Sequence, residues 1–170
     1  MNTDLSVSNS GGALQFLTFS VGEEEFAMDI RTVREIFQYG PMTTVPLMPA
    51  FVRGVINLRG AVVPVIDLQA RFGWAVSPIS KKTCIVIFDS QSEGERVQLG
   101  LLVQEVSEVV DIADDAIEPA PQFGTRVRRE FIRGMSKIDN RFLVILEPEK
   151  AFDINEMALL CESAQSGVVA

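Results

Sequence analysis

The side chains that could do chemistry in this chain are carboxylates, lysines and two cysteines, because the 170-residue sequence contains no histidine. Without an imidazole, neither a Ser-His-Asp nor a Cys-His arrangement can form. Paired carboxylates remain as acid–base candidates, and Asp67 and Glu147 are the acids that follow two apolar runs. Solvation alone explains acids at strand ends, so a carboxylate-based hydrolase is the weakest functional hypothesis.

The cysteines and the glycine-rich loop form no recognisable catalytic or metal-binding motif. Cys84 and Cys161 are far apart and lack metal-ligand spacing, so we interpret both as small hydrophobic residues in a reducing compartment. Gly54 and Gly60 are not followed by Lys-Ser/Thr, and their loop precedes a strand, which excludes a phosphate-binding loop. Both glycines are expected to shape the backbone, by positive φ or close approach. We therefore expect no catalytic residue, no metal and no cofactor.

The charge of the chain argues against a nucleic-acid partner. Its formal net charge is −8, and binding to phosphates requires clustered Lys and Arg. The densest basic stretch, Arg126 to Arg129, is followed at once by Glu130 and is typical of a solvated loop. Residues 1–12 are rich in Ser, Asn and Gly and are expected to be a disordered tail without a signal sequence. No apolar run is long enough to span a bilayer, so we expect a cytoplasmic protein without direct membrane insertion.

One stretch of sequence, residues 51–68, recurs in outline at 131–148. Both copies begin with an aromatic residue, a β-branched residue, Arg and Gly, pass a polar turn, and end an apolar run with an acid. The alignment continues upstream and pairs Val33 with Val106, Glu35 with Glu108, and Ile36 with Val109. It predicts a β-module used twice, at about 14–73 and 83–148, within one domain at 13–153; chance similarity is the alternative.

Hydrophobic patterning predicts mainly strands in both halves. Leu14 to Val21 and the following Phe26 to Ile30 indicate a hairpin, and the second half repeats this order. From Ile30 the apolar spacing changes to Ile30, Val33, Ile36 and Phe37, which predicts a short helical turn or a coiled segment. Pro64 lies within a predicted strand, so one side of that strand should be unpaired.

Helices are predicted only in short segments. Residues 68–72 suit a short helix with Gly73 beyond its end. At the C-terminus, 154–170 is expected to be a helix and tail, with Asn155 as N-cap and one apolar face. That face consists of Met157, Leu160, Cys161 and Ala164. Its polar face lacks Lys and Arg, which favours packing on the protein over binding to a membrane.

Four motifs resemble the CheW family of chemotaxis coupling proteins. They are Val-Arg-Glu-Ile at 33–36, Pro-Ala-Phe-Val-Arg-Gly-Val-Ile-Asn-Leu-Arg-Gly at 49–60, Val-Pro-Val-Ile-Asp-Leu at 63–68 and Glu-Met-Ala-Leu-Leu at 156–160. The resemblance covers about 14–165. It implies a mainly β fold of two packed SH3-like five-stranded barrels, which could exchange strands across the sequence midpoint. It also implies a non-enzymatic adaptor that joins the cytoplasmic tip of methyl-accepting receptors to the histidine kinase CheA.

The resemblance also implies where the receptor binds. In similar proteins the helical receptor tip lies in an apolar groove between the two lobes, a mode in which aliphatic anchors supply affinity and rim charges supply orientation. At the matching positions the groove would be lined by Val33, Ile36, Cys84, Val106 and Val109, with Glu35 and Arg59 as polar contacts. From periodicity alone, the four aliphatic residues would be interpreted as core.

For the kinase, the resemblance implies pairing with the regulatory domain of CheA. Candidate contacts are the loop with Glu118 and Phe123 and an exposed strand carrying Pro64. Alternatives to the adaptor are a CheW-like regulatory module with another partner set, or a piece of a larger CheV- or CheA-like chain. The sequence shows no receiver or kinase segment, which weighs against the last of these.

Overall fold

The structure of this protein is a computed structural model that describes most of the chain between residues 13 and 147. The described residues are 13–44, 46, 48–75, 78–92, 95–119 and 131–147. The expected N-terminal tail, the Arg126 to Arg129 stretch and the C-terminal helix lie outside them, as do Phe123 and Cys161.

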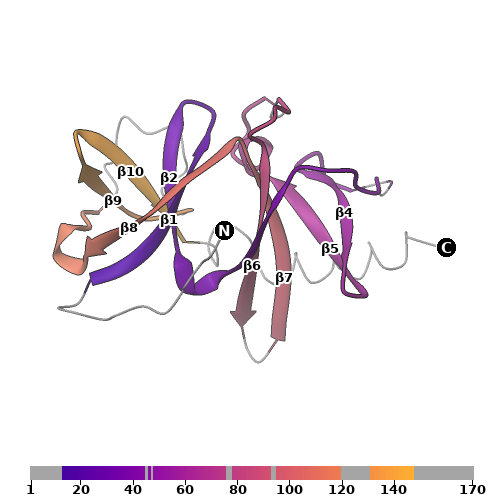
Figure 1. The fold of residues 1–170 in the computed structure, drawn as a ribbon, viewed down its shortest axis with the longest axis horizontal. Helices are drawn as coiled ribbons and strands as arrows, with labels where there is room; N and C mark the ends of the chain where they lie inside the picture. The colour runs from indigo at the N-terminus through magenta and orange to yellow at the C-terminus, as the bar shows by residue number, and fades with distance from the viewer. Residues whose placement is uncertain are drawn as a thin grey trace.

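Two five-stranded mixed sheets form the described part of the molecule (Figure 1). The first sheet has the order β8-β1-β2-β10-β9, with β1 Ala13–Val21, β2 Glu24–Asp29, β8 Glu105–Ala113, β9 Ile132–Ile138 and β10 Arg141–Leu146. The second has the order β3-β6-β7-β5-β4, with β3 Val33–Gln38, β4 Val52–Leu58, β5 Ala61–Asp67, β6 Cys84–Ser92 and β7 Glu95–Val103. The predicted fold class, mainly β with two SH3-like subdomains, is confirmed.

The two sheets have the same construction, but they do not coincide with the two sequence modules. Each sheet contains one parallel pair, β2–β10 in the first and β5–β7 in the second, and its other pairs are antiparallel. The hairpin β1–β2 pairs with β8 and β10 from the second half of the chain, whereas β3 to β7 are consecutive. Strands are therefore exchanged across the midpoint of the sequence.

The core has one layer between the sheets and one inside each subdomain. Along β6, Val86 and Phe88 pack into the cluster shared by both sheets, while Ile85 and Ile87 pack inside the second subdomain. Successive side chains of a strand point to opposite faces, so a strand buried on both faces reads as a continuous apolar run. Phe16 and Leu17 of β1 divide in the same way between the first subdomain and the shared cluster.

The helical turn predicted after Ile30 is mostly wrong. A 3-10 turn, η1 (Ile30–Thr32), is followed directly by strand β3. The pairing of β3 with β6 contains a register shift between Val33 and Glu35, that is, a β-bulge. A bulge adds one residue to a strand, so Val33 and Ile36 face the same side at a separation of three, which resembles helical spacing.

The unpaired side predicted for the strand of Pro64 is found only along the first part of that strand. Its strand, β5, lies between β7 and β4, and Pro64 is buried. On the β4 side it faces Val55, whose backbone N–H and C=O bond Thr43 instead. On the β7 side the parallel pairs begin only at Val65. The missing N–H of proline is thus accommodated locally, inside a sheet.

The short helix predicted after Asp67 is confirmed as α1 (Leu68–Arg71). The Asp67 carboxylate accepts a hydrogen bond from the Ala70 N–H at 3.3 Å and caps the helix. Gly73 follows with φ +84°, the left-handed conformation typical of the residue after a helix end. The other short turn is η2 (Asp114–Ala116).

Candidate protein-binding groove

A groove of about 640 Å³ lies between the edge strands β3 and β8, where the two sheets meet. Its lining is formed by Leu17, Ile30, Val33, Arg34, Glu35, Ile36, Cys84, Val106, Ser107, Glu108 and Val109. Six of the seven residues expected to bind the receptor are in this set, and the seventh, Arg59, is bonded to Glu35. The structure therefore brings together residues from distant parts of the sequence.

The two walls of the groove have equivalent registers. On β3, Val33 is opposite Phe88 and Ile36 is opposite Val86. On β8, the aligned residues Val106 and Val109 are opposite Phe19 and Leu17 of β1. In both pairs of strands a bulge separates the two aliphatic residues. The register thus agrees with the alignment made from the sequence.

The aliphatic lining is graded from core to surface. Val33 has 7% of its surface exposed and belongs to the cluster shared by both sheets. Ile36, Cys84 and Val106 are half-buried and pack against the same cluster. Val109 has 39% exposed. Val33 therefore contributes to the stability of the core, while Val109 leaves apolar surface exposed.

Arg59 reaches the groove from the turn between β4 and β5. Arg59 and Gly60 have φ of +53° and +84°, as required at both central positions of a type I′ hairpin turn. The Arg59 guanidinium donates to Glu35 Oε2 at 2.9 Å and also to Oε1. This hydrogen bonding, together with the positive charge of Arg59, lowers the pKa of Glu35. At the rim of the β3 wall, Glu35 and Arg59 therefore neutralise each other.

The opposite wall has a second Glu–Arg contact that the sequence did not predict. Arg141 Nη2 lies 3.4 Å from Glu108 Oε1, and Arg141 Nη1 bonds both oxygens of Glu25 at 3.0 and 3.1 Å. Arg141 begins β10, directly after the turn at Asp139 and Asn140. One guanidinium thus serves two carboxylates. The alignment of Glu35 with Glu108 was the available signal for this contact.

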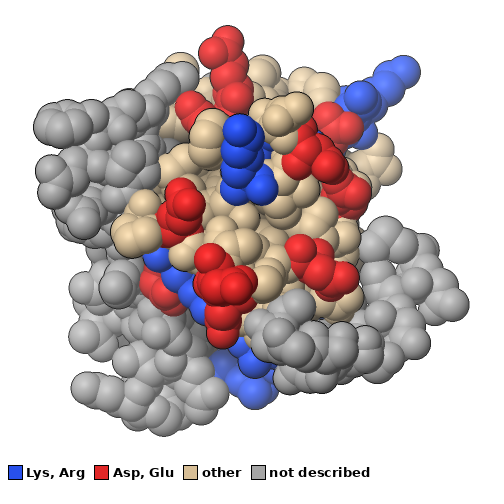
Figure 2. Space-filling model, turned by 90° about the vertical axis from the view of Figure 1, so that its left-hand side faces the viewer, with Lys and Arg blue, Asp and Glu red and all other residues tan. Residues whose placement is uncertain are grey.

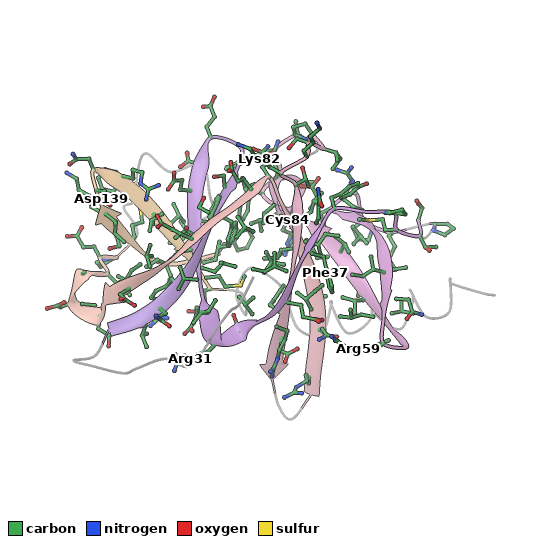
Figure 3. The ribbon with its side chains drawn as sticks, viewed as in Figure 1. Arg31, Phe37, Arg59, Lys82, Cys84 and Asp139 are labelled. Atoms are coloured by element: carbon green, nitrogen blue, oxygen red, sulfur yellow. The ribbon has the colours of Figure 1, made fainter. Side chains whose placement is uncertain are left out.

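Cys84 lines the groove as a small, half-buried hydrophobic residue. Figure 3 shows it between the two sheets, while Arg59 and Asp139 mark hairpin turns at opposite sides of the molecule. Its thiol donates to the Lys82 carbonyl at 3.3 Å. Burial raises the pKa of Cys84, and the nearby Glu105 charge adds to this effect. The protonated thiol is the poorly reactive form.

The two glycines singled out in the sequence, Gly54 and Gly60, are required for different structural reasons. At Gly54, an added Cβ would lie 2.7 Å from the Thr43 carbonyl oxygen, so the neighbouring segment can approach only a glycine. At Gly60, nothing lies within 4 Å of such a Cβ, and the positive φ of the turn is the requirement.

The candidate kinase contacts are less well defined by the structure. Glu118 is exposed, and its backbone N–H and C=O bond Met135 of β9, each at 2.8 Å. It therefore borders the outer edge of the first sheet. Phe123 lies outside the described residues. The exposed strand expected to carry Pro64 is a wrong prediction, because Pro64 is buried in a strand with neighbours on both sides.

The structure gives Asp67 a structural role that argues against the hydrolase hypothesis. Asp67 is fully buried, caps α1, and accepts a hydrogen bond from Arg53 Nη1 at 3.1 Å. A carboxylate in this position cannot meet a substrate. Among the described residues, no three His, Cys, Asp or Glu side chains gather in a way that could hold a metal ion.

Acidic side chains are spread over the end of the molecule formed by the first sheet. Figure 2 shows this face, on which basic side chains stand apart from one another among the carboxylates of the described surface. The described residues contain no helix with the length and apolarity needed to cross a bilayer.

Comparison with known proteins agrees with the fold. The model of the CheW-like domain matches residues 15–156. The chain belongs to the CheW family. The probable chemotaxis protein CheW of Rhizobium etli is 37% identical over 145 residues, covering 85% of this chain and 91% of the relative. The chemotaxis protein CheW of Klebsiella aerogenes is 35% identical over 152 residues, covering 89% of each.

A solved structure of the CheW family has the same fold. The crystal structure of scaffolding protein TtCheW from Thermoanaerobacter tengcongensis superposes with a TM-score of 0.75 at 34% identity, and covers 88% of this chain and 94% of that one. Membership of the CheW family identifies this chain as a chemotaxis scaffolding protein and not an enzyme.

Proposed function

We propose that this protein couples methyl-accepting chemoreceptors to the histidine kinase CheA, and that the groove between β3 and β8 binds the receptor tip. The single observation that carries the proposal is the groove itself, which gathers six of the seven residues inferred from the CheW resemblance. Such a protein would work in the cytoplasm, at receptor arrays on the inner face of the membrane.

The shape and chemistry of the groove suit a helical partner. Aliphatic side chains from both edge strands line its two walls, and charged groups occupy both rims. A helix bound in a groove gains affinity from a few apolar anchors, and charges at the rim fix its orientation. Val109 is the most exposed of the aliphatic anchors inferred above.

For CheA we propose a separate surface, at the outer edge of the first sheet. Glu118, at this edge, and Phe123, which lies outside the described residues, are the candidate contacts with its regulatory domain. Glu118 borders β9, whereas the groove is bounded by β8, at the other end of the same sheet. A scaffold that joins two partners needs two such surfaces.

The test is a reconstitution of CheA autophosphorylation with receptors in membranes. We expect this protein to raise kinase activity only when receptors are present. Val109→Asp should abolish the increase, whereas Ile79→Asp is the matched control: Ile79 has 42% exposed, against 39% for Val109, and does not line the groove. Glu118→Lys and Phe123→Ala should weaken binding to CheA and leave receptor binding unchanged.

Two results would contradict the proposal. If Val109→Asp supported full kinase activation, the groove would not be the receptor site. If neither a receptor nor a CheA-type kinase were captured with this protein from the lysate of its own cell, a CheW-like module with another partner set would be the better description.

A further inference from the structure

The bulge of β8 turns the side chain of Glu108 into the groove. Between the pairs Leu17–Val109 and Phe19–Val106, two residues of β8, Ser107 and Glu108, face one residue of β1, Thr18. Bulges of this kind redirect a side chain relative to the regular alternation of a strand. Ser107 and Glu108 both line the groove as a result.

Thr18 fixes this bulge through two hydrogen bonds to one residue. Its hydroxyl donates to the Glu108 carbonyl at 2.9 Å and accepts from the Glu108 N–H at 3.1 Å. Thr18 is 2% exposed. Buried polar groups are costly to leave unsatisfied, so these two bonds strongly favour one backbone conformation at Glu108.

The carboxylate of Glu108 is only partly neutralised. It is 56% exposed, and its contact with Arg141 is 3.4 Å long. The same guanidinium makes shorter bonds, of 3.0 and 3.1 Å, to Glu25. Near the same wall, Lys82 lies 3.6 Å from Glu105. These ion pairs contain three carboxylates and two cations, so this wall retains negative charge for a partner.

We propose that Glu108 receives a basic side chain, Lys or Arg, of the helix bound in the groove, and that Thr18 is the positioning residue that aims it. The inference rests on the proposed function and adds a charge requirement to the partner. The opposite wall does not offer the same contact, because Arg59 makes two hydrogen bonds to Glu35.

The test measures the affinity of the full chain for a purified cytoplasmic fragment, including the helical tip, of a methyl-accepting receptor from the same genome. We expect Glu108→Gln to weaken binding about ten-fold and to flatten its salt dependence, and Glu108→Lys to weaken it further. Asp111→Asn and Asp111→Lys are the matched controls, because Asp111 is exposed on the same strand but does not line the groove. Both control variants should bind as the unmodified protein does.

Thr18 is tested by a double-mutant cycle with Glu108. Thr18→Val should weaken binding about as much as Glu108→Gln, and Thr18→Ser, which keeps the hydroxyl, should restore it. Because the two residues act through one contact, the variant carrying both Thr18→Val and Glu108→Gln should bind no more weakly than either single variant. Additive losses would show that Thr18 affects binding only through the fold.

The outcomes separate this inference from the proposed function. If the unmodified protein does not bind the receptor fragment, the proposed function is wrong. If it binds and Glu108→Gln binds equally well, only the role of Glu108 is wrong. Tighter binding by Glu108→Lys would show that the partner offers an acidic side chain, which overturns the inference.

Discussion

The two walls of the groove have the same strand register. They differ in the residue that faces the bulge and in how the glutamate at the rim is neutralised. The bulge of β3 faces the apolar Ile87, whereas the bulge of β8 faces Thr18, whose hydroxyl bonds the backbone of Glu108 on both sides. At the rim, Glu35 has two bonds from Arg59, while Glu108 shares Arg141 with Glu25.

Exposure differs between the walls in the same sense. Val33 is buried in the shared core and Ile36 is half-buried, while Val106 is half-buried and Val109 is exposed. The β3 wall therefore contributes mainly to the stability of the fold, and the β8 wall presents more surface to a partner. Equivalent positions in two similar sheets thus differ in how deeply they are buried and in how much surface they expose.

The largest expected effect separates the aliphatic residues of the two walls. Val33→Asp places a charge in the shared core and should lower the free energy of unfolding by roughly 4 kcal/mol. Val109→Asp should change it little, because Val109 is 39% exposed. Chemical denaturation of both variants measures the difference. Equal losses would show that the walls do not differ in this way. Because Val33→Asp is expected to destabilise the fold, it is a poor test of receptor binding.

The second prediction compares the residues that face the two bulges. Thr18→Val keeps the volume but leaves the N–H and C=O of Glu108 without their partner, which should cost about 2 kcal/mol. Ile87→Val, at the equivalent place in the second sheet, removes one methylene and should cost about 1 kcal/mol. Urea unfolding curves provide the measurement. A smaller loss for Thr18→Val than for Ile87→Val would contradict the role of the hydroxyl.

The smallest expected effect concerns the ion pair between Arg59 and Glu35. The pKa of Glu35 is lowered by its hydrogen bonds with Arg59, so the pair contributes stability at neutral pH that is lost as the pH falls through the folded-state pKa. Arg59→Asn keeps a favourable Asn-Gly turn but removes the guanidinium. We expect the Glu35 titration midpoint, followed by carboxyl carbon NMR, to rise toward the ordinary glutamate value.

A midpoint unchanged in Arg59→Asn would show that Arg59 does not hold Glu35 in solution. Arg59→Lys is the control that keeps a positive charge but loses the paired geometry of the guanidinium. Its midpoint should lie between those of the unmodified protein and Arg59→Asn.

Sequence reasoning located the groove better than it located the elements that form it. Val33, Ile36, Val106 and Val109 were assigned to one site through motif resemblance and the internal alignment, and the structure places all four there. The same reasoning predicted a helical turn for β3, because the bulge separates Val33 from Ile36 by three residues. A bulge depends on the partner strand and so leaves no clear signal in a single segment.

The chain by itself determined the mainly β class, the short helix between Asp67 and Gly73, and the turn at Arg59 and Gly60, which follow from local alternation and from helix-end and turn chemistry. The residues of the groove came from the resemblance to the CheW family, because periodicity alone would have assigned the aliphatic ones to the core. Only the tertiary structure decided that β1 and β2 pair with strands from the other half of the chain, that β5 is an inner strand, and that Arg141 meets Glu25 and Glu108. Such contacts join residues far apart in sequence, and the two-residue period of a strand does not specify which partner it pairs with.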